Sequence, residues 1–462
     1  MFGNLSWIKI FMRKIVNRKF NYHNVEELQK DCQINNINLN FSNNINVLNR
    51  SLKVGNRKLP NRLAIQPMEG YDSDNKGGPG ELTFRRYKRF AKGGAGLLWF
   101  EATAILKEGR SNPYQLILNE STKLGFSELL KMTKETAMNE YGSDHEPFCV
   151  LQLTHSGRFS KPYGQRKPLI AVHDSVFDRA VHIDKDYPLL TDEELKYIQE
   201  HFIKAAKLAY NVGFDAVDIK SCHRYLISEL LGTRNRNGKY GGTYENRTRF
   251  LKETIEIIRK EILNLIIAVR LNASDVVRSE NAWGVKKIGN ENEIEIDLDE
   301  PKKLVKELKE LGLSLLNITA GTPYLNPHIN RPYDRPVKGG YNELEHPLHG
   351  VQRLFKLSGE IQKAVPDLPV VGSGYSWLRQ FGGAAAAANV ENGQHALVGF
   401  GRQAFAYPNF ARDLLEKGIM EPRKCCITCS RCSQLMIYGT KTGCVIHDSE
   451  IYAPIFKKAT KI

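Results

Sequence analysis

Five of the eight cysteines in this chain lie within twenty residues near its C-terminal end. Cys426, Cys429, Cys432 and Cys444 form the pattern C-x2-C-x2-C-x11-C, and Cys425 adds a neighbouring thiol. Thiolates packed this closely need a metal centre to neutralise their charge. Three cysteines in a tight run with a distant fourth are typical of ligands to a [4Fe–4S] cluster, which transfers single electrons. A structural zinc site is the alternative, and a ligand role for Cys425 in place of Cys426 stays open.

A second group of side chains could bind an organic cofactor and activate a substrate. The amide of Gln152 can donate and accept hydrogen bonds at once, which suits the edge of a flavin ring. A fixed charge at Arg270 would stabilise that ring in its reduced, anionic form. Lys220 and His223 could hold a substrate carbonyl or carboxylate, and the hydroxyl of Tyr225 could protonate a carbon beside it. The competing interpretation is that Arg270 forms a buried ion pair and Gln152 is an ordinary polar strand end. His223 and Tyr225 would then be packing side chains of the core.

The elements that would position these residues are eight short apolar runs separated by helical patterns. The runs are 63–66, 96–100, 148–153, 216–219, 266–271, 315–318, 370–371 and 397–400. Helical patterns with charged faces cover residues 191–210, 245–260 and 300–311, and Thr191 with Glu194 forms a capping box. Eight strands that alternate with helices predict an α/β fold, a TIM (β/α)8 barrel, rather than a doubly wound sheet.

Three regions follow from this pattern. Residues 1–45 are rich in asparagine and are expected to form an N-terminal extension, residues 46–415 the barrel, and residues 416–462 a cysteine-rich iron–sulfur tail. Residues 52–59 resemble a small hairpin around Gly55 and Asn56, which could plug the N-terminal end of the barrel.

Active sites of such barrels lie where the strands end, at the C-terminal face. The seventh strand runs into Gly372, Ser373 and Gly374, and the eighth into Gly401 and Arg402. Barrels often bind phosphate at this place, because glycine lets the main chain approach phosphate oxygens and arginine can pair with them. Two such turns, one with an arginine, favour phosphate binding over simple tight turns.

Composition excludes some classes of protein and leaves others open. The net charge is +15, but lysines and arginines are scattered without a dense basic block, so no nucleic acid partner is expected. No apolar run reaches about eighteen residues, so no membrane span is predicted. Basic residues interrupt the first nineteen positions, which argues against a secretory signal and leaves a short amphipathic helix open. Clustered and isolated thiols indicate a reducing, cytoplasmic location.

Several motifs together resemble the Old Yellow Enzyme family of FMN-dependent oxidoreductases, also called NADH:flavin oxidoreductases. They are Asn61 to Met68, Gln152 to Arg158, Tyr240 to Arg247, and Gly401 with Arg402. The cysteine tail is similar to the branch that contains 2,4-dienoyl-CoA reductase, 2-enoate reductase and trimethylamine dehydrogenase, in which a [4Fe–4S] cluster lies beside FMN. The resemblance covers residues 47–444, roughly the whole predicted barrel and the cysteines.

This resemblance implies a role for each matching residue. Pro67, Met68, Gln152 and Arg270 would contact the flavin ring, and Gly374, Gly401 and Arg402 would surround the FMN phosphate. Gly372 and Ser373 belong to the same predicted phosphate-binding turn as Gly374. Lys220 and His223 would orient the substrate, Tyr225 would protonate it, and Cys426, Cys429, Cys432 and Cys444 would ligate iron.

Three positions depart from the family's pattern. Lys220 stands where histidine is common, and Glu69 stands where a smaller side chain is usual near the flavin. The larger relatives also continue into further nucleotide-binding domains, whereas this chain ends eighteen residues after Cys444 and shows no G-x-G-x-x-G there. We therefore expect electrons to come from another protein, a soluble carrier or NAD(P)H.

The expected function is reduction of an activated C=C bond of an enone, enoate or enoyl thioester. Hydride would pass from flavin N5, and the [4Fe–4S] cluster would relay electrons. One alternative is oxidation of an amine, with electrons leaving through the cluster. Another is a flavin barrel that acts on RNA and resembles the dihydrouridine synthases. The sequence is compatible with an oligomer but does not predict one.

Overall fold

The computed structural model describes residues 19–286, 294–343 and 345–461. Its centre is a closed barrel of eight parallel strands in chain order, with the last strand paired to the first. The strands are β3 (Leu63–Ile65), β4 (Leu97–Ala104), β5 (Phe148–Thr154), β6 (Ala216–Ile219), β7 (Ile266–Asn272), β8 (Leu315–Thr319), β9 (Val370–Gly372) and β10 (Leu397–Phe400). Every apolar run that the sequence offered as a strand is one, and the TIM barrel is confirmed.

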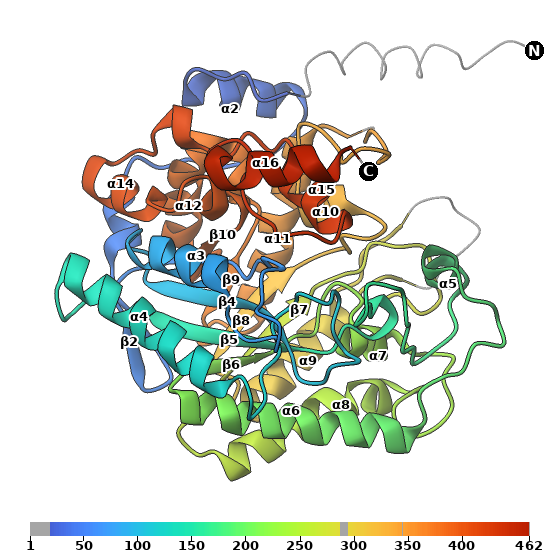
Figure 1. Cartoon of the computed structure of the whole chain (residues 1–462). Coiled ribbons are helices and arrows are strands. Elements are labelled where there is room, and N and C mark those ends of the chain that lie inside the picture. The colour runs from blue at the N-terminus through green and yellow to red at the C-terminus, as the bar shows by residue number, and fades with distance from the viewer. Residues whose placement is uncertain (1–18, 287–293, 344, 462) are drawn as a thin grey trace, which may run out of the picture.

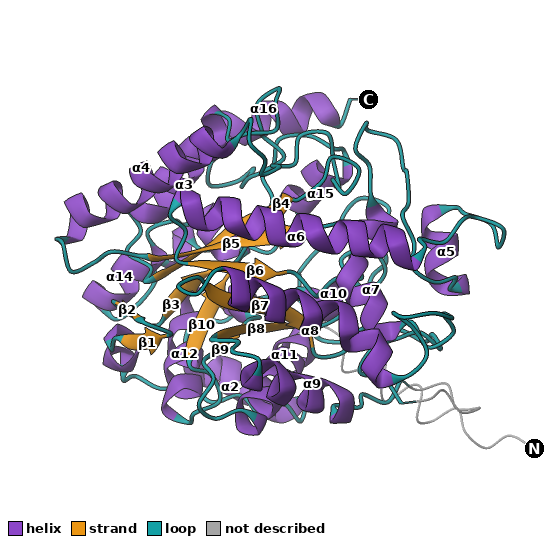
Figure 2. Ribbon diagram, turned by 90° about the horizontal axis from the view of Figure 1, so that it is seen from below, coloured by secondary structure: helices purple, strands orange, loops and turns teal. Residues whose placement is uncertain are grey.

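Helices form an outer ring around the strands, as seen in Figure 2. The ring contains α3 (Glu81–Ala91), α4 (Lys123–Tyr141), α6 (Asp192–Val212), α8 (Tyr244–Glu261), α9 (Asp299–Glu310), α11 (Pro347–Ala364), α12 (Gly382–Glu391) and α14 (Phe410–Lys417). The predicted capping box starts α6: Thr191 Oγ1 accepts from the Glu194 N–H at 3.1 Å, and the Glu194 carboxylate accepts from the Thr191 N–H at 2.8 Å.

A two-stranded hairpin closes the N-terminal end of the barrel. Its strands are β1 (Leu52–Val54) and β2 (Arg57–Leu59), which pair antiparallel across a turn that contains Gly55 in the left-handed region. Val54 and Leu59 are buried against the inward-facing side chains of the barrel strands, including Trp99 and Phe148. The hairpin is therefore the plug that the sequence predicts, and chemistry is left to the opposite end.

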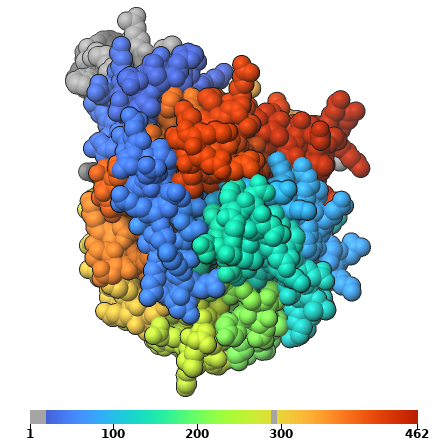
Figure 3. All heavy atoms as spheres, turned by 90° about the vertical axis from the view of Figure 1, so that its left-hand side faces the viewer, coloured from blue at the N-terminus to red at the C-terminus, as the bar shows by residue number. Residues whose placement is uncertain are grey.

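The chain before the hairpin packs along the barrel wall. The helix α2 (Val25–Ile34) buries Leu28 and Cys32 in the main core, and η1 (Ile45–Asn49) packs on α12. In Figure 3 this blue segment lies beside orange and red-orange atoms of the C-terminal third of the chain. The short amphipathic helix considered for the first residues lies outside the part of the chain that the structure describes.

The cysteine-rich segment folds against the barrel, next to α3. It contains η4 (Pro422–Lys424), α15 (Arg431–Ile437) and α16 (Ser449–Ala459), drawn in red in Figure 1. Asp448 pairs with Arg85 and Arg89 of α3, and the Thr442 N–H donates to the Gly70 carbonyl at 2.7 Å. Gly70 follows β3, so the tail is joined to a strand end. Across the described residues, no helix is long and apolar enough to cross a membrane.

Candidate functional site

Three strands hold a buried carboxylate that joins two of the predicted cofactor-binding residues. Asp218 of β6 accepts from Gln152 Nε2 of β5 at 2.5 Å and from the Arg270 N–H of β7 at 2.7 Å. It also accepts from Trp99 Nε1 at 2.9 Å. Burial raises the pKa of Asp218 to about 6, against the lowering effect of these donors. Asp218 therefore fixes the amide of Gln152 and the backbone at Arg270.

The Arg270 side chain is a buried cation without a full set of partners. It is 8% exposed, and its Nε has no hydrogen-bond partner among the described residues. Burial lowers the pKa of Arg270. Gln66, after β3, has a similar deficit: its Oε1 accepts from Asn317 Nδ2 at 2.7 Å, while its Nε2 is buried without a partner. These unfilled donors suit a ligand with several oxygen or nitrogen acceptors.

The mouth of the barrel brings Lys220, Tyr225 and Glu69 together. Lys220 Nζ lies 3.8 Å from Glu69 Oε1 and 3.9 Å from the centre of the Tyr225 ring. Tyr225 Oη lies 3.5 Å from the same Glu69 oxygen, and Ser111 Oγ donates to the other at 2.8 Å. Burial lowers the pKa of Lys220 and raises the pKa values of Glu69 and Tyr225. The departure at Glu69 thus places a carboxylate beside the predicted proton donor.

His223 lies between Lys220 and Tyr225 in the loop after β6. Its φ angle of 64° is left-handed, and its Nε2 lies 2.9 Å from Asn330 Nδ2. With the amide nitrogen donating, Nε2 is the acceptor and Nδ1 carries the proton. Burial and the charges of Arg270 and Lys220 hold the pKa of His223 well below its usual range. His223 is therefore a neutral donor and acceptor at neutral pH.

The two glycine turns lie side by side after β9 and β10. Gly374 has a φ of 106° and precedes η3 (Tyr375–Phe381), and Gly401 precedes α13 (Arg402–Ala406). The Gln403 N–H donates to Ser376 Oγ at 3.3 Å and joins the two turns. A Cβ at Gly372 would lie 2.4 Å from the His395 ring, so this glycine serves packing rather than ligand approach. The Ser373 hydroxyl likewise donates to the Ile318 carbonyl at 3.2 Å.

Two arginines near these turns have unfilled donors. Arg402 NH2 donates to the Pro332 carbonyl at 2.5 Å, while its NH1 is buried without a partner. Arg331, after α10 (Pro327–Asn330), has a buried Nε without a partner in the described residues. Burial and the nearby charge of Arg402 lower the pKa of Arg331 to about 10. Two guanidinium groups this close favour a doubly charged anion between them.

The four predicted iron ligands line one pocket. Cys426, Cys429, Cys432 and Cys444 surround it together with Arg402 and His447. Burial raises the pKa of Cys426 to about 12 and of Cys444 to about 11, and the Arg402 charge opposes this at Cys426 and Cys432. Within the described ranges, no three His, Cys, Asp or Glu side chains are grouped closely enough to hold a metal ion.

Cys425 faces away from that pocket. Its thiol accepts from Gln403 Nε2 at 3.2 Å and donates to the Glu421 carbonyl at 3.4 Å. The backbone of Cys426 is fixed by the same amide, since its N–H donates to Gln403 Oε1 at 2.9 Å. Of the two neighbouring cysteines, the geometry places Cys426 with the other three.

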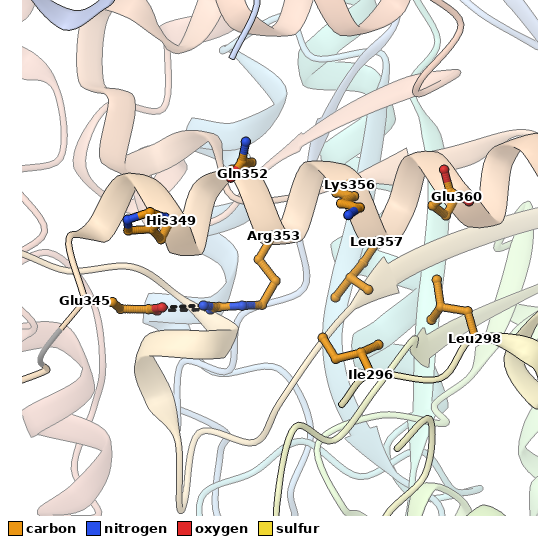
Figure 4. A pocket seen from close by; sticks show the side chains of 9 residues that line it. All are labelled: Ile296, Leu298, Glu345, His349, Gln352, Arg353, Lys356, Leu357 and Glu360. Atoms are coloured by element: carbon orange, nitrogen blue, oxygen red, sulfur yellow. Dashed lines mark hydrogen bonds and ion pairs between the residues drawn. The ribbon is translucent and has the colours of Figure 1, made fainter. Parts of the chain in front are cut away.

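A surface pocket elsewhere has no strand-end residue in its wall. It lies along α11 from His349 to Glu360, with Ile296 and Leu298 opposite, as Figure 4 shows. Both of its carboxylates already have partners, because Glu345 pairs with Arg353 and Glu360 with Lys302. We assign this pocket no role in the chemistry.

Sequence reasoning missed three polar residues of the site: Tyr324, Arg331 and Asn330. All three belong to the long connection between β8 and α11, which carries no recognisable motif. Pro67 and Met68 do follow β3 as expected, and Met68 packs against the core. Tyr324 Oη lies 2.9 Å from Tyr225 Oη, a contact that only the fold reveals.

Two curated bacterial enzymes are similar to this chain. An NADPH dehydrogenase of Clostridium acetobutylicum is 38% identical over 210 residues, which are 45% of this chain and 58% of that protein. An NADPH dehydrogenase of Halalkalibacterium halodurans is 30% identical over 287 residues, or 61% of this chain and 73% of the relative. The chain thus spans between about half and three quarters of these relatives.

Solved structures share the fold at low identity. A 2-naphthoyl-CoA reductase aligns with a TM-score of 0.67 and 20% identity, covering 87% of this chain and 57% of that one. An Old Yellow Enzyme homologue from Zymomonas mobilis gives 0.57 and 21%, covering 81% and 94%. The model of the NADH:flavin oxidoreductase / NADH oxidase family matches residues 48–310, more than half of the chain. This protein therefore belongs to the NADH:flavin oxidoreductase / NADH oxidase family of enzymes.

Proposed function

We propose that the mouth of the barrel binds FMN and reduces an activated alkene. The observation that carries this proposal is the buried Arg270 side chain with its unpartnered Nε, next to an amide that Asp218 holds in place. Gln152 and Gln66 would contact the polar edge of the flavin, and Arg331 with Arg402 would hold its phosphate. When bound, the flavin would supply hydride to the alkene.

The residues at the mouth then have separate tasks. Lys220 and His223 would donate to the carbonyl that activates the alkene, and this would stabilise the negative charge that develops on its oxygen. Tyr225 would give its hydroxyl proton to the α-carbon. Because burial raises its pKa, Tyr225 stays protonated until a strongly basic carbon appears. Phe159 and Tyr324, stacked at 3.7 Å, would shield this step from bulk water.

We further propose that the cysteine pocket holds a [4Fe–4S] cluster. Support comes from four thiols that line one pocket and follow each other in the C-x2-C-x2-C-x11-C order that is typical of cluster ligands. Arg402 lines this pocket and lies near Arg331, whose charge also lowers the pKa of His223. The cluster would therefore lie close to the proposed phosphate site, and an outside carrier could exchange electrons with it.

An anaerobic reductive titration of the purified protein tests both cofactors. FMN accepts two electrons, and one cluster adds about one more. Three electrons per chain would support the proposal, and two would reject the cluster. The reduced protein is then mixed with 2-cyclohexenone and a 2-butenoyl thioester. Oxidation of the flavin with a saturated product would support alkene reduction, and no reaction with any enone, enoate or enoyl thioester would contradict it.

Amine oxidation is the second candidate, and the charge at the mouth disfavours it. Lys220, Arg270 and Arg331 surround the site, whereas two carboxylates, Glu69 and Asp218, lie close to it among the described residues. A protonated amine would meet mainly positive charge. Anaerobic mixing of the oxidised protein with small amines distinguishes the two directions, because bleaching of the flavin would favour oxidation.

A further inference from the structure

Tyr225 has little direct access to bulk water. Its side chain is 4% exposed, and its hydroxyl contacts Glu69 and Tyr324. Each turnover of the proposed reaction would remove the hydroxyl proton of Tyr225. A second group must therefore return a proton before the next substrate is reduced.

Most polar groups around this hydroxyl are as buried as Tyr225 itself. Glu69 is 7% exposed, Ser111 and Lys220 are 5% exposed, and Tyr71, whose hydroxyl lies 3.3 Å from Ser111 Oγ, is also 5% exposed. If one of these groups gave its proton to Tyr225, that group would itself lack a proton and would have equally little access to water. The path to solvent must begin at a residue that reaches water.

Tyr324 meets this requirement. Its hydroxyl lies 2.9 Å from that of Tyr225, and the residue is 42% exposed. The ring stacks on Phe159 at 3.7 Å with an angle of 9° between the planes. The loop is also fixed, because the Tyr324 N–H donates to Thr322 Oγ1, and this hydroxyl donates to the His223 carbonyl at 3.3 Å.

We propose that Tyr324 is a proton relay that reloads Tyr225 from solvent, which rests on the alkene reduction proposed above. In the first step the Tyr225 O–H bond breaks as a C–H bond forms at the α-carbon. The Tyr324 O–H proton then passes across 2.9 Å to the Tyr225 phenolate. Water protonates the Tyr324 phenolate and leaves hydroxide, so charge and protons balance. Burial and the charge of Glu69 raise the pKa of Tyr324, with Arg166 and Arg331 opposing this in part, so the transient Tyr324 phenolate readily takes a proton from water.

The first test uses Tyr324→Phe in the complete enzyme. Tyr225 is protonated at the start, so the first turnover keeps its rate while later turnovers slow by about tenfold or more. Rapid mixing should show a burst of one product per site, and a small buffer acid should restore the later turnovers. KM should change little, because Tyr324 acts through Tyr225. Steady turnover at the wild-type rate without a burst would overturn the proposal.

Tyr163→Phe is the matched control. Tyr163 is 65% exposed and its ring lies 5.1 Å from Lys107 Nζ, but its hydroxyl has no hydrogen bond to any described residue. This variant should show no burst and no rescue by buffer. A burst of equal size in both variants would mean that loss of any surface tyrosine hydroxyl slows the enzyme, which overturns a specific relay.

A second measurement requires no turnover. With 3-fluorotyrosine at position 225, the ¹⁹F signal in mixed H₂O and D₂O reports how fast the hydroxyl exchanges with solvent. Tyr324→Phe should slow this exchange by about tenfold or more, and Tyr163→Phe should leave it unchanged. Unchanged exchange in Tyr324→Phe would overturn the relay. If no alkene is reduced but exchange still depends on Tyr324, the proposed function has failed and the relay stands.

Discussion

Two buried arginines of the barrel mouth differ in what surrounds them. Arg158 donates to Glu229 at 2.6 Å, to Asp178 and to the Val172 carbonyl at 2.6 Å. Arg270 has no comparable set of acceptors, although it is nearly as buried. A buried charge that is fully paired holds the fold together, whereas one that lacks partners is stabilised by a ligand. We therefore expect the same substitution to have opposite effects on stability at Arg158 and at Arg270.

Arg270→Met should make the cofactor-free protein more stable by about 1–3 kcal/mol, because it removes a poorly paired buried charge. The same change should weaken FMN binding about 10- to 100-fold. Arg158→Met is the control and should cost about 3–5 kcal/mol, since it leaves Glu229 unpaired. Thermal unfolding and quenching of FMN fluorescence measure these effects. Equal destabilisation by both variants would show that Arg270 is a structural residue.

Asp218 makes stability depend on pH in the cofactor-free protein. Burial raises its pKa from 3.8 to about 6, so the folded state binds the proton more tightly than the unfolded state does. The stabilisation of the folded state by protonated Asp218 is complete below pH 3.8 and is lost as the pH rises to about 6. Asp218→Asn resembles the protonated form. Between pH 4 and pH 7, the variant should gain up to about 3 kcal/mol relative to the wild type in urea unfolding. A constant difference across this range would contradict the expectation.

Site residues that lie in strands could be predicted from the sequence, whereas site residues in irregular loops could not. Gln152 and Arg270 lie inside strands, where a polar residue in an apolar run signals a function. Tyr324 and Arg331 lie in a connection whose path depends on contacts with Asn330, Thr322 and other loop residues. No local pattern determines such a path, so these two residues required the fold.

At the scale of elements, one carboxylate joins the cysteine segment to the barrel. Asp334 accepts from Trp377 Nε1 at 2.7 Å and pairs with Arg379 at 2.8 Å, both in η3. Its backbone N–H donates to Thr428 at 3.3 Å, between two of the predicted iron ligands. The turn after β9 and the cysteine pocket are thus fixed to each other through a third loop.

Asp334→Ala should loosen the cysteine segment and leave the barrel intact. We expect the free energy of unfolding to fall by about 2–4 kcal/mol, because the variant leaves Arg379 and the indole N–H of Trp377 without their acceptor. Residues 421–447 should be cut sooner by a protease, and the thiols should react faster with a disulfide reagent. Asp334→Asn keeps an acceptor for Trp377 and should be intermediate. Unchanged proteolysis would show that α15 and α16 hold the segment without this contact.

Two adjacent residues of the cysteine segment, Cys425 and Cys426, should differ in their effect on iron content. Cys426→Ser should remove most iron and acid-labile sulfide, because Cys426 lines the pocket. Cys425→Ser should keep the full iron content, because its thiol bonds to Gln403 and Glu421 instead. Metal analysis and low-temperature EPR of the reduced proteins test this pair. Loss of iron from Cys425→Ser alone would reverse the assignment.

Strands were easier to predict than the tail. Each barrel strand is buried on both faces, so it appears as a continuous apolar run, and the eight runs agree with the strands within a few residues. The tail has short helices whose packing depends on ion pairs such as Asp448 with Arg85. Such pairs join distant parts of the chain and leave no periodic signal.

At the scale of the whole molecule, the net charge of +15 should affect electron exchange with the outside carriers proposed above. An acidic one-electron carrier should reduce the protein fastest at low salt, because opposite charges steer the encounter. The rate should fall by at least about tenfold when ionic strength rises from about 20 mM to about 500 mM. A neutral small mediator is the control and should show little salt dependence. Equal salt dependence for both would exclude steering by charge.

The pairing of β10 with β3 has a consequence for how the protein is made. The ribosome releases β3 first, and its partner β10 is synthesised more than 330 residues later. Throughout that interval the backbone donors and acceptors of β3 face no strand on one side, and an open strand edge promotes aggregation. Translation that stops before residue 397 leaves this edge exposed permanently. Incomplete chains should therefore depend on chaperones and be degraded, whereas complete chains close the ring.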